Sequence, residues 1–484
     1  MRLRNLFMIL LLCMTVGLFA VSCSDGDTGP QGPPGETGPP GPAGTPAPTP
    51  DPEDDGDDDD MSEADCISHK FGPNDVEKFT GGDGDEVICG NKRSNVIEGM
   101  GGDDTISGAG GNDTLEGGPG DDELHGGEGD DTLKGEAGDD TLKGEAGKDT
   151  LYGGDGKDTL YGGEGDDMIK EEDTDTDVID GGVGTDTLDY SALTLANLRD
   201  AVTPAIATDD DVYLHVSLTE GESAIWENEG SPEEPDFSAR KILDIIEKEI
   251  ENVIGSTARN HLVGDDKDNV LTITGTILNG NKIKGMGGHD TIDAGWTTDT
   301  PGANDLVDGG AGNDTLVVGA GGFTLPAAPA GADASSGIRG IENLAVRADV
   351  TGGVTLTGDA QANTLTGGGG EDTINGGAGN DTINGGKGED TTLNGQAGND
   401  IYVIGYQEGR DTITLNYNVN EKDMVHLKGF PKDQRSHSKI DEVADAAAQI
   451  AVNGAPVLTL ATGDGNASRT DVLTHKASIF KFVD

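Results

Sequence analysis

Aspartate recurs at one fixed place in a repeat of nine residues that runs ten times without a gap from Gly81 to Lys170. In copies such as 126–134 (GGEGDDTLK), Gly stands at positions one, two and four and Asp at position six. Carboxylates at a constant spacing can line up along the edge of a stacked fold, where they would bind a hard cation. Glu86 and Asn95 replace the aspartate in the first two copies, and the last eight copies supply Asp104, Asp113, Asp122, Asp131, Asp140, Asp149, Asp158 and Asp167.

Position eight of every copy is Leu or Ile, as at Leu133 and Leu142. The glycines permit a sharp turn, and the remaining residues are few enough to form one short extended segment. We therefore expect two repeats to make one coil, with a strand on each side and the position-eight residues inside. Successive coils would stack at about 4.8 Å, as strands of a parallel sheet do. Since each coil gains its interior only from its neighbours, a single repeat is unstable.

Stacked coils would place the position-six carboxylates in rows that repel one another unless a cation lies between them. Calcium takes six to eight oxygen ligands from carboxylates and backbone carbonyls, and glycine turns present their carbonyls freely. We predict calcium ions between turns, held by aspartates two repeats apart, with about eight ions in a row of ten repeats. Cys and His are too scarce for zinc, and magnesium demands a tight octahedron.

These repeats resemble the RTX (repeats-in-toxin) motif G-G-x-G-x-D-x-U-x. The resemblance implies a parallel β-roll that binds several calcium ions.

The pattern returns after Lys170 with altered lengths and ligands. Asn260 and Asn269 occupy position six in the copies 255–263 and 264–272, which predicts poor calcium binding there. The copy that begins at Gly385 has one extra residue, which predicts a bulge. The further aspartates at position six are Asp186, Asp290, Asp314, Asp372, Asp381, Asp390 and Asp400.

We therefore predict an all-β protein, with a parallel β-roll (β-solenoid) in two or three blocks after a disordered N-terminal stalk. The apolar and polar residues of the tail alternate, which predicts a β-cap over the open edge. The predicted segments are a lipoprotein signal peptide at 1–22, a collagen-like and acidic linker at 23–60, the first RTX β-roll at 61–189, an insert or linker at 190–254, a degenerate second roll at 255–317, a linker at 318–357, a third roll at 358–403 and the C-terminal β-cap at 404–484.

The N-terminus has the pattern of an export signal. Arg2 and Arg4 precede an apolar run that is shorter than the ~20 residues of a spanning helix, which indicates a secretory signal peptide. The sequence AVSC at residues 20–23 resembles the lipobox of bacterial lipoproteins. That resemblance implies an acylated Cys23, and Ser24 after it implies the outer membrane.

Seven triplets with Gly first follow from Gly26, as in a collagen. They predict either a stiff polyproline-II spacer or a short stem that forms a trimer. Cys66 and Cys89 could form one disulfide in an oxidising compartment.

Composition limits what the chain can be and bind. Gly makes up 80 of the 484 residues, aromatic residues 4%, and the formal net charge is −61. Such a chain cannot build a large apolar core, and its self-repulsion opposes compaction without cations. The charge also excludes nucleic acid as a partner, because phosphate binding needs a basic surface.

No metalloprotease H-E-x-x-H or lipase G-x-S-x-G motif occurs in the sequence. Our leading hypothesis is therefore a non-enzymatic, calcium-binding structural or adhesive protein on the bacterial surface, with cell surfaces or polysaccharide as candidate ligands. The alternatives are a secreted RTX effector exported by a type I pathway, and an enzyme with its site in the 190–254 insert or in the tail.

Overall fold

The computed structural model describes residues 69–70, 78–201, 212–228, 237–274, 280–296, 305–326, 337–405, 411–414, 423–428, 440–443, 448–452, 455–460 and 480–483. The predicted signal peptide, Cys23, the collagen-like and acidic linker and Cys66 lie outside these residues. Cys89 is disulfide-bonded. Within the described part of the chain, no helix is long and apolar enough to cross a membrane.

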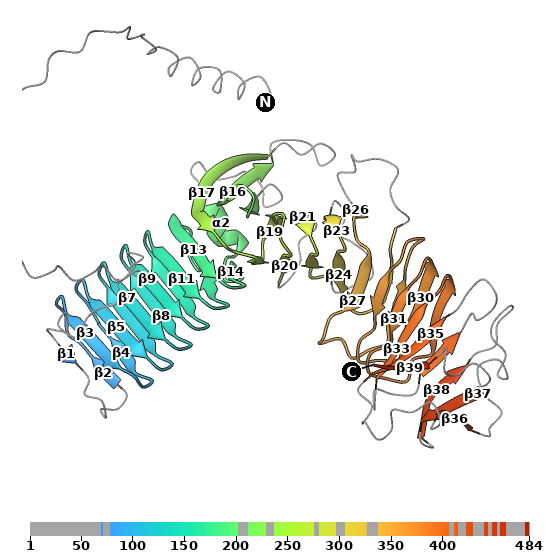
Figure 1. Cartoon of the computed structure of the whole chain (residues 1–484). Coiled ribbons are helices and arrows are strands. Elements are labelled where there is room, and N and C mark those ends of the chain that lie inside the picture. The colour runs from blue at the N-terminus through green and yellow to red at the C-terminus, as the bar shows by residue number, and fades with distance from the viewer. Residues whose placement is uncertain are drawn as a thin grey trace, which may run out of the picture. The chain divides into compact units, whose positions relative to one another are not determined.

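The nine-residue repeats form stacked coils of a parallel β-solenoid, which confirms the predicted fold class (Figure 1). A typical strand is β8 (Thr132–Ala137), which extends from position seven of one repeat to position three of the next. It pairs in parallel with β6 (Thr114–Pro119) and β10 (Thr150–Asp155), so each residue lies beside the one 18 positions away in sequence. Because each coil holds two repeats, successive strands enter opposite sheets.

The described strands lie in three sheets, and within each sheet every strand pairs with the next one named. The first contains β1 (His69–Lys70), β3 (Val87–Asn91), β5 (Thr105–Gly110), β7 (Glu123–Glu128), β9 (Thr141–Ala146), β11 (Thr159–Glu164), β13 (Asp177–Val183), β17 (Phe237–Lys248), β16 (Glu222–Asn228), β15 (Val212–Ser217), β19 (Arg259–Val263), β21 (Lys282–Gly288), β23 (Leu306–Gly312) and β26 (Gly337–Arg339).

The second sheet contains β2 (Lys78–Thr80), β4 (Val96–Glu98), β6, β8, β10, β12 (Met168–Lys170), β14 (Thr187–Asp189), β18 (Asn252–Gly255), β20 (Val270–Ile273), β22 (Thr291–Asp293), β24 (Thr315–Val318), β27 (Asn343–Val346), β29 (Thr364–Thr366), β31 (Thr382–Asn384), β33 (Ile401–Gly405), β35 (Met424–Lys428) and β39 (Phe480–Val483). The third contains β25 (Gly322–Thr324), β28 (Thr355–Thr357), β30 (Thr373–Ala378), β32 (Thr392–Ala397), β34 (Asp411–Thr414), β38 (Ala455–Leu460), β37 (Ala448–Val452) and β36 (Ile440–Val443).

The interior of the first block is a single ladder of position-eight side chains. Leu115, Leu133 and Leu151 lie directly beside one another in the second sheet, and each is fully buried. In the first sheet, Ile106, Leu124 and Leu142 likewise lie beside one another and are fully buried. The coil therefore buries about one large apolar side chain per repeat, which is little compared with an ordinary globular core.

Glycine is needed at two places in the turn for two different reasons. At position four, Gly138 has a φ of +145°, and an added Cβ would lie 1.8 Å from the carbonyl oxygen of Gly120 in the coil below. At position one, a Cβ on Gly135 would lie 2.2 Å from Oδ2 of Asp140 and 2.6 Å from the carbonyl oxygen of Gly153. Position two is less strict, because Glu136 occupies it with a φ of +81°.

The described strands of the segment 190–254 are part of the solenoid. After β14 it forms the short helix α2 (Leu195–Asp200), whose N-cap is Thr194, and then the antiparallel strands β15, β16 and β17. The first sheet incorporates all three strands, because β17 pairs in parallel with β13, and β15 pairs in parallel with β19. The second sheet passes directly from β14 to β18. The ladder thus crosses this segment, while the exact domain boundaries stay a prediction.

The tail continues the stack in the same way. β35 pairs in parallel with β33, and β39 pairs with β35, so these strands add coils to the second sheet. The antiparallel strands β36, β37 and β38 extend the third sheet. The predicted bulge at the ten-residue copy is wrong, because β30 and β32 pair without a register shift. The extra residue, Thr391, lies in the turn before β32, where the chain can lengthen without breaking a ladder.

Replacing Leu142 with Ala is expected to destabilise the first block by about 3 kcal/mol, because it opens a cavity in a ladder that has no second layer of side chains. The calcium-loaded full chain would be unfolded by denaturant and followed by circular dichroism. Lys157→Ala serves as the control, since that side chain is exposed in a turn of the same block. Equal midpoints for the two variants would contradict this account of the core.

Candidate calcium-binding rows

The first block has two rows of carboxylates. One row lies in the turns before the strands of the first sheet, and the other lies in the turns before the strands of the second sheet. In each row, Oδ1 of one position-six aspartate accepts a hydrogen bond from the backbone N–H of the position-six residue one coil earlier. The N–H of Asp122 donates to Asp140, and the N–H of Asp140 donates to Asp158, at 2.7 and 2.8 Å. In the other row, the N–H of Asp131 donates to Asp149 at 2.7 Å. The backbone thus fixes one oxygen of each carboxylate.

The second oxygen, Oδ2, is buried and has no hydrogen-bond partner among the described residues at twelve of the predicted site residues. They are Asp104, Asp113, Asp122, Asp131, Asp140, Asp149, Asp158, Asp167, Asp186, Asp290, Asp314 and Asp381. Each of these residues is at most 2% exposed. A buried, unpaired carboxylate oxygen is costly, so these atoms require a proton or a cation.

The space beside each position-one glycine is bordered by oxygen atoms. Next to Gly135 these are Oδ2 of Asp140 and the carbonyl oxygen of Gly153, which belongs to the following coil. Gly126 has the same surroundings, with Oδ2 of Asp131 and the carbonyl oxygen of Gly144. A set of carboxylate and carbonyl oxygens from two stacked turns matches the ligands that Ca²⁺ prefers. The residues present therefore fit calcium.

Burial dominates the electrostatics of the rows. Removal from water raises the pKa of Asp113, Asp140, Asp149 and Asp158 to about 7, although a backbone N–H bond partly opposes the shift in each case. Burial likewise raises the pKa of Asp122 to about 6. Charges of neighbouring aspartates in the same row add to the effect for Asp140 and Asp149. Without metal, the folded rows therefore bind protons more tightly than an unfolded chain would.

All fifteen aspartates predicted from the sequence are buried in turns of the solenoid. Asp390 and Asp400 accept the N–H bonds of Asp372 and Asp381, as the pattern requires. Asp372 differs, since its Oδ1 accepts from Val354 and its Oδ2 from the N–H of Gly368. Its carboxylate is therefore satisfied by the backbone alone, which makes it the weakest candidate ligand of the set.

Sequence reasoning missed several residues that occupy the same place. Asp177 accepts from the N–H of Asp158 and extends its row, although its repeat has ten residues. Asp305, Asp411 and Asp423 accept the N–H bonds of Asn281, Asp390 and Asp400. Each lies two residues before a buried aliphatic side chain, as a position-six aspartate does. The spacing to this aliphatic residue would have identified them, whereas a search for the glycine pattern of the repeat did not.

Glu takes the place of Asp at two points of the second sheet. Oε2 of Glu251 accepts from the N–H of Asp186 at 3.0 Å, and Oε2 of Glu342 accepts from the N–H of Asp314 at 2.8 Å. One coil later the position-six residue is asparagine in both cases, and its side-chain amide donates to the carbonyl of the glutamate. Asn269 donates to Glu251 at 3.0 Å, and Asn363 donates to Glu342 at 2.8 Å.

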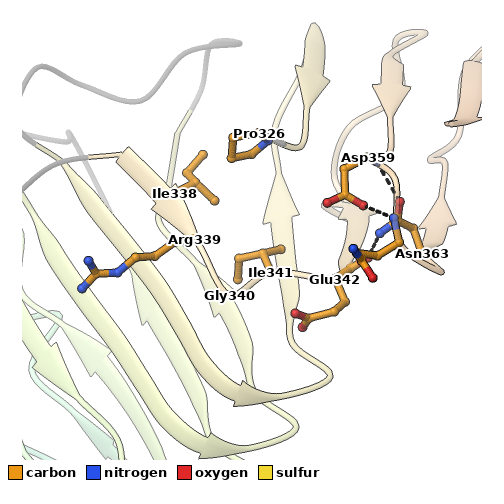
Figure 2. A pocket seen from close by; sticks show the side chains of 9 residues that line it. Pro326, Ile338, Arg339, Gly340, Ile341, Glu342, Asp359 and Asn363 are labelled. Carbon is orange, nitrogen blue, oxygen red and sulfur yellow. Dashed lines mark hydrogen bonds between the residues drawn. The ribbon is translucent and has the colours of Figure 1, made fainter. Parts of the chain in front are cut away.

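We call these two pairs, Glu251 with Asn269 and Glu342 with Asn363, the Glu–Asn joints. Figure 2 shows the second, where Asn363 reaches Glu342 and also accepts the N–H of Asp359 at 2.9 Å. An amide group donates where a carboxylate cannot, so the joint is satisfied by hydrogen bonds alone. The joints divide the carboxylate row of the second sheet into three runs.

The fold and the rows of buried carboxylates define a cation-binding parallel β-solenoid. The family model described as RTX calcium-binding nonapeptide repeat (4 copies) matches residues 80–115, 107–142, 116–150, 134–169, 279–301, 302–322 and 357–391. These segments are RTX repeats, and such repeats bind multiple calcium ions. The matched segments contain most of the aspartates with an unpaired Oδ2.

No curated protein matches the sequence. Among solved structures, the chain is similar to the extracellular lipase LipA from Serratia marcescens, with 14% sequence identity and a TM-score of 0.14. The match covers 79% of this chain and 45% of the lipase chain, so this chain spans less than half of its length. A likeness at that TM-score carries no argument about activity.

The raised pKa values predict that acid stabilises the roll when calcium is absent. A group whose pKa is higher in the folded than in the unfolded state adds stability at low pH and loses it as the pH rises through the folded value. For the aspartates described above, this loss falls between about pH 4 and pH 7. The metal-free full chain should therefore show more β-structure by circular dichroism at about pH 5 than at about pH 7.5.

The calcium-loaded protein is the control for this experiment, because the ion replaces the proton and should maintain the fold at the higher pH. A metal-free chain with more β-structure at the higher pH would show that the buried carboxylates do not govern folding.

Proposed function

We propose that this chain is a calcium-folded structural or adhesive protein displayed on the bacterial cell surface and anchored in the outer membrane through Cys23. The observation that carries the proposal is the pair of rows of buried aspartates whose Oδ2 atoms have no hydrogen-bond partner. These rows are repeated over many coils, so a large share of the chain serves to bind calcium and to build length.

Calcium binding supplies the free energy that the narrow core lacks. In the absence of the ion, the net charge of −61 and the unpaired carboxylates favour an expanded chain. Millimolar calcium outside the cell neutralises the rows, and binding free energy becomes folding free energy. The chain would thus pass the membrane unfolded and fold only after export.

The N-terminal sequence supports the surface location. The lipobox-like AVSC at residues 20–23 would give an acylated Cys23, and several acyl chains on one cysteine anchor a protein stably. The collagen-like triplets and the acidic run from Asp51 to Asp60 would then hold the solenoid away from the lipid, either as a single spacer or as a trimeric stem. Cell surfaces or polysaccharide are the ligands that we propose for the exposed faces.

Adding calcium to the metal-free full chain should produce a cooperative gain of β-structure in circular dichroism, and a chelator should reverse it. Asp140→Ala should raise the calcium midpoint and lower the number of bound ions by one or two, because Asp140 contacts the turns on both sides. Asp155→Ala is the matched control, since Asp155 is an exposed aspartate of the same block. A spectrum that does not respond to calcium would refute the proposal.

Replacing Cys23 with Ala should abolish labelling by a radioactive fatty acid and release the protein from the outer-membrane fraction. Cells that carry the original chain should present it to antibody or added protease from the outside. Retention of the variant in the membrane fraction would show that another segment provides the anchor.

A further inference from the structure

Three buried carboxylates meet where the first block ends and the segment with β15, β16 and β17 begins. Glu171 follows β12, Asp177 starts β13, and Asp244 belongs to β17. One carboxylate oxygen from each lies within 4.8 Å of the others. The three residues are 5%, 2% and 1% exposed. Residues far apart in sequence thus bring three acidic groups into one water-poor place.

This cluster differs from the repeated turn sites. Glu171 follows directly on position nine of the last regular repeat, at the place where the earlier repeats have their position-one glycine. In the earlier repeats, a Cβ on this glycine would contact the position-six aspartate of the same turn. Asp177 is the equivalent aspartate here, so the side chain of Glu171 extends toward it. Asp244 comes from outside the repeats. Its Oδ1 accepts a hydrogen bond from the backbone N–H of Asp177 at 3.4 Å.

None of the described Lys and Arg side chains forms an ion pair with the cluster. Oδ2 of Asp244 accepts two hydroxyl bonds, from Tyr190 at 2.6 Å and from Ser223 at 2.7 Å, and the side chain of Asp177 shares hydrogen bonds with those of Glu171 and Asp244. Oε1 of Glu171 is buried and has no hydrogen-bond partner. The neighbouring ion pairs join Lys241 to Asp175 and Lys170 to Asp189, and neither involves the cluster.

From this geometry we infer that Glu171, Asp177 and Asp244 bind a further calcium ion, which fastens β17 and the strands attached to it onto the last coil of the first block. Oxygens that share one Ca²⁺ lie at most about 5 Å apart, since each Ca–O distance is about 2.3–2.6 Å, and the cluster is within that limit. All three donors are hard oxygen ligands, which favours calcium, magnesium or manganese over zinc or copper. Three buried carboxylates this close together cannot all remain charged without a counter-ion, so the cluster must take up either protons or a cation.

The direct test is a crystal structure of the calcium-loaded full chain with anomalous scattering recorded for calcium. We expect an anomalous peak between the three carboxylates in addition to those in the repeat turns. Peaks in the turns with none at this cluster would overturn the inference and leave the proposed function intact.

A second test counts bound ions by native mass spectrometry of Glu171→Leu at saturating calcium. Leucine can fill the buried space and cannot ligate, so one calcium fewer than in the unchanged protein is expected. Glu172→Leu is the matched control, because Glu172 is adjacent in sequence and exposed. If Glu171→Leu binds as many ions as the unchanged protein and unfolds at a higher temperature, the cluster holds protons, and the inference is wrong.

Discussion

The structure depends on one interaction, the hydrogen bond from a backbone N–H to Oδ1 of the aspartate one coil further on. It fixes each carboxylate so that Oδ2 is buried beside the carbonyl oxygens of the adjacent turn, where only a proton or a cation can satisfy it. The bond recurs at every coil of the first block, so the backbone itself sets the spacing of the rows. At neutral or higher pH the fold then requires a cation in these rows, because a buried charge without a partner is strongly destabilising.

The other features of the repeat follow from that carboxylate. Position one must be glycine because the aspartate oxygen and a carbonyl oxygen occupy the space that a Cβ would need. Position four is glycine in the regular copies because the coils approach so closely there that their backbones touch. The leucines and isoleucines of position eight then fill an interior only one side chain wide. Such a core stabilises a coil weakly, so hydrophobic burial alone does not account for an ordered solenoid.

The regular part of this structure was predictable from the sequence because its period is constant. Spacing alone identified Asp140 as a row residue and Leu142 as a core residue, and both lie where the repeat placed them. The nine-residue period did not lead to Asp244 and Glu251, since they enter the rows after inserts of other lengths, and Asp177 could be recognised only by its spacing to the buried Ile179. In a stacked fold, the strand after an insert must only pair in register with the strand of the preceding coil. The insert itself can have any length and therefore leaves no periodic signal in the sequence. The incorporation of β15 to β17 into the first sheet escaped prediction for the same reason.

The Glu–Asn joints affect how the solenoid responds to a pulling force. Backbone pairing joins all of these coils; shared ions would add to it within a run, whereas each joint adds an amide-to-carbonyl hydrogen bond that no chelator removes. A pulling force along the ladder is carried in series by contacts of both kinds. The calcium concentration of the medium would therefore set the resistance of the runs to extension, whereas the hydrogen bonds of the two joints do not depend on it.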